Sequence, residues 1–405
     1  MTVISEKLVF ENRAGEELAG TLDRPVGTPT ATALFAHCFT CSKDLPASGR
    51  ISRELAARGI AVLRFDFTGL GSSDGDFANS NFSSNVDDLV RAADALAERM
   101  AAPRLLVGHS LGGAAVLAAA RRIESVEAVA TIGAPAEPAH VKHLLVNDAQ
   151  EIEEEGEAEV EIGGRRFRIR RQFLEDLDSQ HLGAELGDLD AALLVMHAPL
   201  DKIVEISNAE RIYRAARGFK SFVSLADADH LLTKAADARY AAEVLAAWAG
   251  RYIATNERKQ PEPLEGHVLV EELERPYTNR VVARQHGMLA DEPRSAGAHD
   301  AGPTPYEYLL AALGSCTSMT LRMYADHKGW PLEHVSVSLT HSKIHAQDCA
   351  TCEQEDGKVD RIERVLRITG HELDDDQRAR LLEIADRCPV HRTLMGEKEI
   401  LTRLV

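Results

Sequence analysis

The sequence lacks any long uninterrupted apolar run of the kind that spans a membrane as a helix. It also lacks an excess of basic residues: 46 lysines and arginines stand against 64 aspartates and glutamates, for a formal net charge of −18. Phosphate contacts need clustered basic side chains, so this balance argues against binding to nucleic acids or anionic membranes. The first residues, Met1–Glu6, do not show the basic and then apolar pattern of a secretion signal, and we therefore expect a cytoplasmic protein.

Cysteine is scarce, with six residues in a chain of 405. This number is too small for a disulfide scaffold, so the cysteines are expected to be inert, metal-binding or catalytic. Cys38 and Cys41 have the spacing of a redox dithiol, but we interpret them as buried small residues. Two histidines and two cysteines further on have a spacing that suits zinc: His341, His345, Cys349 and Cys352. A surface hairpin with incidental thiols is the favoured interpretation there, and we predict no metal and no cofactor.

The chain is longer than one hydrophobic core usually supports, which predicts two or three domains. Residues 1–252 alternate short apolar segments with helical ones, and this order predicts an α/β domain with a doubly wound, mostly parallel sheet. Residues 253–264 are polar with two prolines and are expected to form a linker. Residues 265–405 place strands around a long helix from about 305 to 328, which predicts an α+β domain.

One segment of the first domain, residues 137–186, interrupts the alternation of strands and helices. An acidic run at 151–155 and a basic run at 165–171 lie on either side of Gly163 and Gly164, which predicts a β-hairpin. Two interpretations remain open. The hairpin is either a solvated element with complementary charges or a small lid over the carboxyl ends of the strands.

A nucleophile signature, Gly108-His109-Ser110-Leu111-Gly112, stands between an apolar strand and a helix. Its glycines permit the tight turn that lifts a serine hydroxyl off the edge of a sheet. The following helix directs its N–H groups and the positive end of its dipole toward the site. Asp201 and His230 follow the last two strands predicted in this domain, at 192–196 and 221–225, so both lie at carboxyl ends where such a site must be.

These residues, in the order Ser, Asp, His, resemble the α/β-hydrolase superfamily, and within it the lipases, esterases and acyl-peptidases with a small lid. The resemblance covers about residues 1–252. It implies that Ser110 is the nucleophile, His230 the general base and Asp201 the acid that orients it. Asp229 is the rival acid, but a neighbour in the chain is poorly placed to reach the ring of His230.

The same resemblance implies an oxyanion hole made by the backbone N–H groups of Leu111 and Phe39. Phe39 follows His37 and Cys38, where the family usually has His-Gly. The family's glycine helps to place the backbone there, so the chain departs from the family pattern at the residue before the Phe39 donor. Asp66 is expected to brace a loop.

A second nucleophile, Cys316, lies in the long helix within Gly314-Ser315-Cys316, and Cys388 follows the last predicted helix, directly before a proline. Two cysteines on separate helices are what a peroxide-reducing dithiol needs, because one attacks the O–O bond and the other resolves the sulfenic acid as a disulfide. Glu307 adds a carboxylate to the helix of Cys316.

Together with the Pro-x-Glu opening of the long helix, these features resemble the OsmC/Ohr family of thiol peroxidases. The resemblance implies that Cys316 is the peroxidatic cysteine and Cys388 the resolving one, in an intertwined homodimer that reduces organic hydroperoxides with a dithiol. It also implies an arginine–glutamate pair beside the thiolate. Glu307 is the candidate glutamate, with Tyr306 at the same place in an alternative register. Arg280 and Arg294 are both candidates for the arginine.

The two halves in this order resemble a bacterial fusion of a hydrolase with an OsmC-like domain. We therefore expect a bifunctional enzyme that hydrolyses small acyl esters and reduces organic hydroperoxides, as a homodimer or higher oligomer through the C-terminal domain. Oxidised acyl esters would be a substrate shared by both halves. The alternative is a serine hydrolase that a non-catalytic OsmC-like module pairs into dimers.

Overall fold

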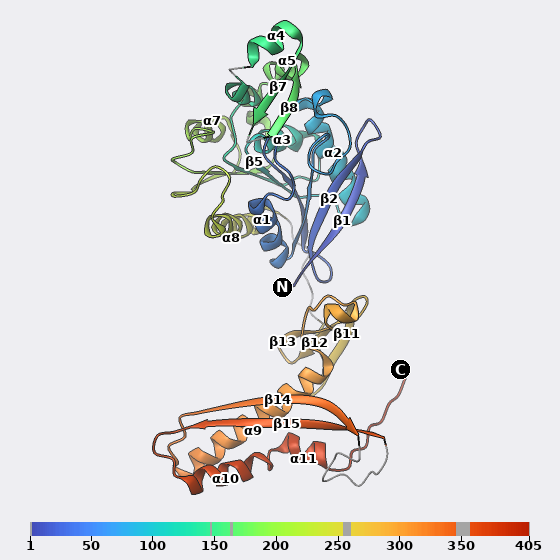
Figure 1. Cartoon of the computed structure of the whole chain (residues 1–405), viewed down its shortest axis with the longest axis vertical. Coiled ribbons are helices and arrows are strands. Elements are labelled where there is room, and N and C mark those ends of the chain that lie inside the picture. Colours follow the sequence, from blue (N-terminus) through green and yellow to red (C-terminus); the bar gives the residue numbers. More distant parts are fainter. Residues whose placement is uncertain (1, 146–147, 163–164, 254–260, 346–356, 405) are drawn as a thin grey trace. The chain divides into compact units, whose positions relative to one another are not determined.

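The computed structural model describes residues 2–145, 148–162, 165–253, 261–345 and 357–404. The chain divides into two units, Met1–Pro261 and Glu262–Val405 (Figure 1). Most of the expected linker, residues 254–260, lies outside the described residues. None of the described helices is long and apolar enough to cross a membrane.

The first unit is built on an eight-stranded sheet, which confirms the predicted α/β class (Figure 1). Its strands, in spatial order, are β1 (Val3–Glu11), β2 (Glu17–Pro25), β4 (Ile60–Phe65), β3 (Ala31–Ala36), β5 (Leu105–His109), β6 (Ala128–Ile132), β9 (Ala192–His197) and β10 (Lys220–Ser224). From β4 to β10, all neighbouring strands pair in parallel. Strands β1 and β2 form an antiparallel hairpin at one edge of the sheet, where β2 pairs antiparallel with β4. The central strands are buried along their whole length, which is why they appear in the sequence as continuous apolar runs.

Helices cover both faces of this sheet. They are α1 (Pro46–Ala57), α2 (Phe82–Arg99), α3 (Leu111–Ala119), α7 (Ser207–Ala215) and α8 (Ala235–Tyr252). Successive side chains of a strand point to opposite faces, so Leu34 joins the core under α2 and α3 while Phe35 joins the core under α1 and α8. The two cores pack the sheet between two helical layers, and the carboxyl ends of the parallel strands remain available for a site.

The segment 137–186 forms a separate group of short elements. These are η3 (Pro138–Leu145), α4 (Ala149–Glu155), β7 (Glu157–Ile162), β8 (Arg165–Arg170), α5 (Arg171–Ser179) and α6 (Leu182–Glu185). Strands β7 and β8 pair antiparallel, with Ile162 opposite Arg165, so the hairpin prediction is confirmed although Gly163 and Gly164 themselves lie outside the described residues. The hairpin has a charged face and an apolar face, and its role as a lid stays a prediction. Its outer face carries charge pairs such as Arg170–Glu157 at 3.0 Å, while Val160 and Ile169 are buried in the core under α2 and α3.

The second unit has the predicted α+β composition. Its described residues form a three-stranded antiparallel sheet, a long two-stranded ribbon and three helices (Figure 1). Their bounds are β11 (Val268–Glu274), β12 (Thr278–Ala283), β13 (His286–Ala290), α9 (Pro305–Lys328), β14 (His334–His345), β15 (Lys358–Thr369), α10 (Asp375–Ala385) and α11 (Pro389–Met395). A small core joins α9 to α10 through Leu321, Leu381 and Ile384. Short 3₁₀ turns complete both units: η1 (Phe77–Asn79), η2 (Ala120–Arg122), η4 (Leu186–Asp188) and η5 (Arg294–Ala296).

Candidate active site

Ser110 stands at the sharp turn between β5 and α3. Its backbone has φ 55° and ψ −126°, a conformation that L-residues rarely adopt, and its N–H donates to the Ile132 carbonyl at 2.9 Å. The flanking glycines are needed for this turn. A Cβ on Gly108 would lie 2.3 Å from the carbonyl oxygen of Gly112, and a Cβ on Gly112 would lie 2.3 Å from that of His37. The strain is therefore held by close packing on both sides of the serine.

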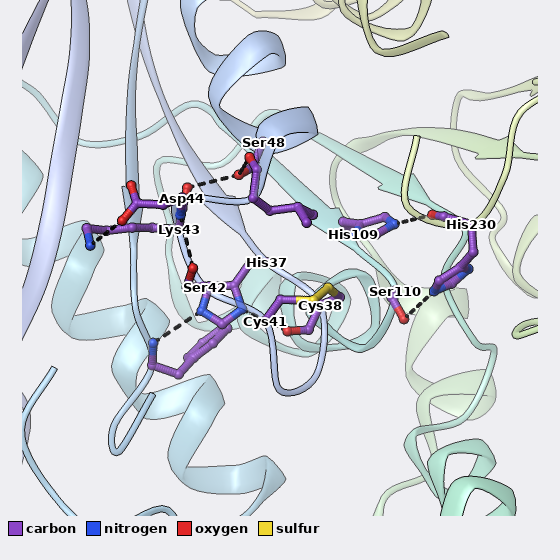
Figure 2. Close-up of a disulfide and its surroundings, with 12 residues drawn as sticks. His37, Cys38, Cys41, Ser42, Lys43, Asp44, Ser48, His109, Ser110 and His230 are labelled. Carbon is purple, nitrogen blue, oxygen red and sulfur yellow. Dashed lines mark hydrogen bonds and ion pairs between the residues drawn. A yellow bond between two sulfur atoms is a disulfide. The ribbon is translucent and has the colours of Figure 1, made fainter. Parts of the chain in front are cut away.

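The structure brings Ser110, His230 and Asp201 together. The hydroxyl of Ser110 donates to His230 Nε2 at 3.0 Å (Figure 2). His230 Nδ1 in turn donates to Asp201 Oδ2 at 2.7 Å. The second carboxylate oxygen of Asp201 accepts the N–H groups of Ile203 at 2.8 Å and Val204 at 3.0 Å. A carboxylate fixed in this way holds the imidazole in the tautomer that can take a proton from the serine.

The charge state of Asp201 suits this arrangement. Burial alone would raise the pKa of Asp201, but the hydrogen bonds from His230, Val204 and Ile203 outweigh it, so that the pKa lies below its usual value. Asp229 does not contact the ring of His230. Its carboxylate instead bonds the N–H and hydroxyl of Thr233, and these bonds, above all that from the hydroxyl, lower the pKa of Asp229.

Two neighbours of the His–Asp pair were not identified from the sequence. His109 donates from Nε2 to the His230 carbonyl at 2.6 Å, and complete burial lowers the pKa of His109 to about 3, so its imidazole is neutral. Gly133, with φ +58°, follows β6, and a Cβ there would lie 3.4 Å from both Asp201 Oδ2 and His230 Nδ1. A glycine directly after a buried strand is the signal that marks such a close approach.

The loop between β3 and α1 differs from the expectation for its cysteines. Cys38 and Cys41 form a disulfide, with their Cα atoms 5.3 Å apart, so the interpretation of two incidental buried thiols is wrong (Figure 2). The turn folds back at Thr40, with φ 62°, and this brings the two sulfur atoms within bonding distance. Spacing alone does not distinguish such a turn from an extended buried segment.

Asp66 and Leu111 lie near this loop, at the positions expected from the sequence. Asp66 is buried and accepts Lys43 N at 2.6 Å, Lys43 Nζ at 2.9 Å and Ser72 N at 2.9 Å, so it does brace the loop. Leu111 is the first residue of α3, where a backbone N–H has no intrahelical partner. The Phe39 ring stacks on Phe173 of α5 at a centroid distance of 5.4 Å, which connects the loop to the inserted segment.

A cavity of about 450 Å³ opens beside the His–Asp pair. Its lining combines Asp201 and His230 with three exposed apolar side chains, Leu200, Ile203 and Leu231. Ser110 is not part of this lining, which also includes five further polar side chains: Lys202, Asp227, Asp229, Thr233 and Lys234.

In the second unit, Cys316 and Cys388 are both free thiols. Cys316 is half-buried in α9, and Cys388 is fully buried at the start of α11. Their helices meet at Thr317, whose hydroxyl lies 3.6 Å from the Cys388 sulfur and accepts Nη1 of Arg364 at 3.0 Å. Arg364, on β15, was not among the arginines considered from the sequence, and Arg280 instead pairs with Glu271 at 3.1 Å.

Glu307 is not beside Cys316 within the chain. Its carboxylate accepts the N–H of Thr304, and the Thr304 hydroxyl accepts the N–H of Glu307, which makes a capping box at the start of α9. Nine residues correspond to two and a half turns of helix, so Cys316 lies on the opposite face about 13 Å away along the axis. The pattern Thr-x-x-Glu is itself the signature of this cap.

No cluster that suits a metal ion occurs among the residues that the structure describes. Cys349 and Cys352 lie outside them. Of the two histidines in that pattern, His341 bonds Asp360 at 2.8 Å and stacks on Tyr306.

Comparison with known proteins agrees with this architecture. A model of the alpha/beta hydrolase family matches residues 33–279, more than half of the chain. The chain belongs to the alpha/beta hydrolase family. A second model, of OsmC-like proteins, matches residues 297–402, so both families are present in one chain, as the sequence predicted.

Individual relatives match the hydrolase unit. The solved esterase domain of a Rhodothermus marinus protein is 50% identical, with a TM-score of 0.52 over 62% of this chain and 100% of that one. The mouse mitochondrial palmitoyl-protein thioesterase ABHD10 is 32% identical over 36% of this chain and 50% of its own length. The chain thus spans about half the length of the curated relative it matches. The solved mouse alpha/beta hydrolase domain-containing protein 10, at 22% identity and a TM-score of 0.51, shares the fold.

Proposed function

We propose that the N-terminal unit hydrolyses acyl esters by acyl transfer to Ser110, with His230 as general base and Asp201 as its orienting acid. The observation that carries this proposal is the chain of two hydrogen bonds from Ser110 Oγ to His230, at 3.0 Å, and from His230 to Asp201, at 2.7 Å. The 50% identical Rhodothermus marinus esterase domain supports the ester class. The mouse palmitoyl-protein thioesterase makes acyl thioesters the second class to assay.

The proposed reaction has two halves. His230 Nε2 takes the hydroxyl proton while Ser110 Oγ attacks the carbonyl carbon, and the N–H groups of Leu111 and Phe39 stabilise the oxyanion. The imidazolium then returns its proton to the leaving alcohol, which leaves an acyl-serine. Water, deprotonated by the same imidazole, releases the carboxylic acid and restores Ser110.

The test is hydrolysis of p-nitrophenyl acyl esters of increasing chain length by the purified chain. Ser110→Ala is expected to lower kcat by about 10⁴- to 10⁶-fold. Ser83→Ala, at an exposed position of α2, is the matched control and should retain full activity. A fluorophosphonate probe should label the peptide that contains Ser110. Undiminished turnover in Ser110→Ala would overturn the proposal.

For the C-terminal unit we propose reduction of organic hydroperoxides, because two free cysteines lie on helices that meet at Thr317. The thiolate of Cys316 attacks the distal oxygen of ROOH and releases the alcohol, which leaves a sulfenic acid. Cys388 then attacks that sulfur, water leaves, and a dithiol reduces the resulting disulfide. The rival proposal is a non-catalytic module that pairs hydrolase units.

Cysteine variants separate these two proposals. With a dithiol supplied, Cys316→Ser is expected to abolish consumption of an organic hydroperoxide. Cys388→Ser should accumulate a sulfenic acid at Cys316, which a sulfenic-acid probe detects by peptide mapping. Unchanged hydroperoxide consumption in Cys316→Ser, with the oligomer intact by light scattering, would favour the non-catalytic module.

A further inference from the structure

The Cys38–Cys41 disulfide encloses Phe39 and Thr40, and Phe39 is the residue whose N–H is assigned above to the oxyanion hole. Both sides of the enclosed segment are anchored to the fold. Before it, His37 Nδ1 donates to the Cys38 carbonyl at 2.8 Å. After it, Lys43 is held by the buried carboxylate of Asp66. The disulfide is the covalent constraint on the segment between these anchors.

The enclosed turn needs that constraint. Thr40 has φ 62°, in the left-handed region, which a β-branched residue adopts only when its surroundings impose it. Inside the loop, one backbone hydrogen bond, from Cys41 N to the Cys38 carbonyl at 3.2 Å, closes the same turn. Without the sulfur–sulfur bond, the conformational preference of Thr40 opposes the turn and only this hydrogen bond and side-chain packing favour it.

The loop is also in close contact with the nucleophile. Gly112, two residues after Ser110, lies so near the carbonyl of His37 that a Cβ would stand 2.3 Å from its oxygen. A cavity of about 10 Å³, lined by Cys38, Phe39 and Leu111 among others, lies against both proposed oxyanion donors. A change in the turn therefore alters the distance between Phe39 N and the atoms that react at Ser110.

We propose that the Cys38–Cys41 disulfide is a positioning element of the acyl-transfer site, so that ester hydrolysis depends on its oxidation state. The inference rests on the proposed function of Ser110. A dithiol reduces the Cys38–Cys41 disulfide in two steps. One thiolate of the dithiol attacks a sulfur of the disulfide and displaces the other cysteine. The second thiol then attacks the mixed disulfide, which frees the first cysteine and closes the reductant into a cyclic disulfide. Two electrons and two protons pass to Cys38 and Cys41. Cys41 is partly exposed, which gives a small dithiol access.

A dithiol that regenerates the proposed Cys316–Cys388 pair would thereby also lower ester hydrolysis in the same chain. Hydrolysis would then be fastest while hydroperoxide keeps the dithiol pool oxidised. This relation links the two halves through a shared reductant and requires no contact between them.

The experiment compares the full chain before and after dithiothreitol, with the state of Cys38 and Cys41 verified by differential alkylation and peptide mapping. Reduction is expected to lower kcat for p-nitrophenyl butyrate by about 10- to 100-fold with KM nearly unchanged, because an oxyanion donor acts only in the transition state. The rate of Ser110 labelling by a fluorophosphonate should fall in parallel. Reoxidation should restore both rates.

Two double variants complete the test. Cys38→Ala/Cys41→Ala should have the low kcat of the reduced chain and no response to dithiothreitol, whereas Cys316→Ser/Cys388→Ser should retain the response. Turnover and labelling that survive verified reduction of Cys38 and Cys41 overturn this inference alone. An oxidised chain with neither turnover nor labelling of Ser110 overturns the proposed function, and this inference with it.

Discussion

At the scale of single residues, the two aspartates near His230 have opposite expected roles. Asp201→Asn is expected to lower kcat by about 10⁴-fold, because an amide cannot hold the imidazole in the tautomer that accepts the serine proton. Asp229→Asn is the matched control, since Asp229 bonds Thr233, whereas the ring of His230 bonds Asp201. Ester hydrolysis by the two variants checks this, and an Asp229→Asn variant as inactive as Asp201→Asn would contradict it.

The serine, aspartate and histidine can be predicted from the sequence because each lies just after the end of a strand. Ser110, Asp201 and His230 each follow a strand of the parallel part of the sheet, and parallel strands bring their carboxyl ends to one edge. The strands before Ser110 and Asp201 are fully buried, whereas β10, before His230, is partly exposed and was expected to be buried. The Cys38–Cys41 disulfide and the placement of Arg364 beside Thr317 are not predictable in this way. The first depends on a left-handed Thr40, and the second on the pairing of a long ribbon with α9, neither of which leaves a local pattern.

Asp88 gives the first unit a pH-dependent stability. Burial raises the pKa of Asp88 to about 6, against the two hydrogen bonds that it accepts from Thr68. The folded chain therefore binds a proton between about pH 4 and 6 that the unfolded chain releases, so this group favours folding below that window and opposes it above. Raising the pH from 4 to 7 should cost about 3 kcal/mol of unfolding free energy through Asp88.

Asp88→Asn removes this titration but keeps an oxygen that can accept from Thr68. The wild type should lose about 3 kcal/mol of unfolding free energy between pH 4 and 7 through Asp88, and the variant should not show this loss. Urea unfolding at both pH values measures the difference. Asp94→Asn, at an exposed position of the same helix, is the control. Parallel pH profiles for Asp88→Asn and wild type would show that Asp88 does not titrate in this window.

At the scale of elements, α5 of the inserted segment contacts the loop that carries Phe39, which we propose as an oxyanion donor. Phe173 is 2% exposed and packs on Phe39 and Phe77. Phe173→Ala should lower the unfolding free energy of the first unit by about 3 to 5 kcal/mol, as large cavities do, and lower kcat by loosening Phe39. Phe173→Leu keeps most of the apolar volume and should cost about 1 kcal/mol. Wild-type stability and kcat in Phe173→Ala would show that the insertion does not support the loop.

The bounds of helices and strands were predicted more accurately where the segment is apolar or has clear end signals. The helix at Pro305–Lys328 matches its expected bounds, because Thr304 caps its start and Gly329, in the left-handed conformation, ends it. The ribbon β14–β15 runs to 12 residues a strand, well beyond the apolar segments that indicated it. Its ends alternate apolar residues with exposed charges such as Lys343 and Arg361, which resemble a loop when burial is unknown.

At the scale of the whole molecule, the buried residues fall into separate cores. Two large cores share the sheet of the first unit, and a small one joins α9 to α10 in the second. A core that small leaves large apolar side chains exposed on α9, among them Met319 at 65% and Met323 at 72%. A second copy of the C-terminal unit is the expected cover, as the resemblance to OsmC-like dimers implies.

Calorimetry of the full chain tests this expectation. We predict two unfolding transitions, because units with their own cores unfold separately unless their interface is large. Leu321→Ala should lower one transition only and so assign it to the second unit, since Leu321 is fully buried in the small core. If a second copy covers α9, the assigned transition alone should rise in temperature with protein concentration, because association stabilises the folded state by mass action. If neither transition temperature changes with protein concentration, the second unit is stable as a monomer. The alternative of a non-catalytic module that pairs hydrolase units would then lose its basis as well.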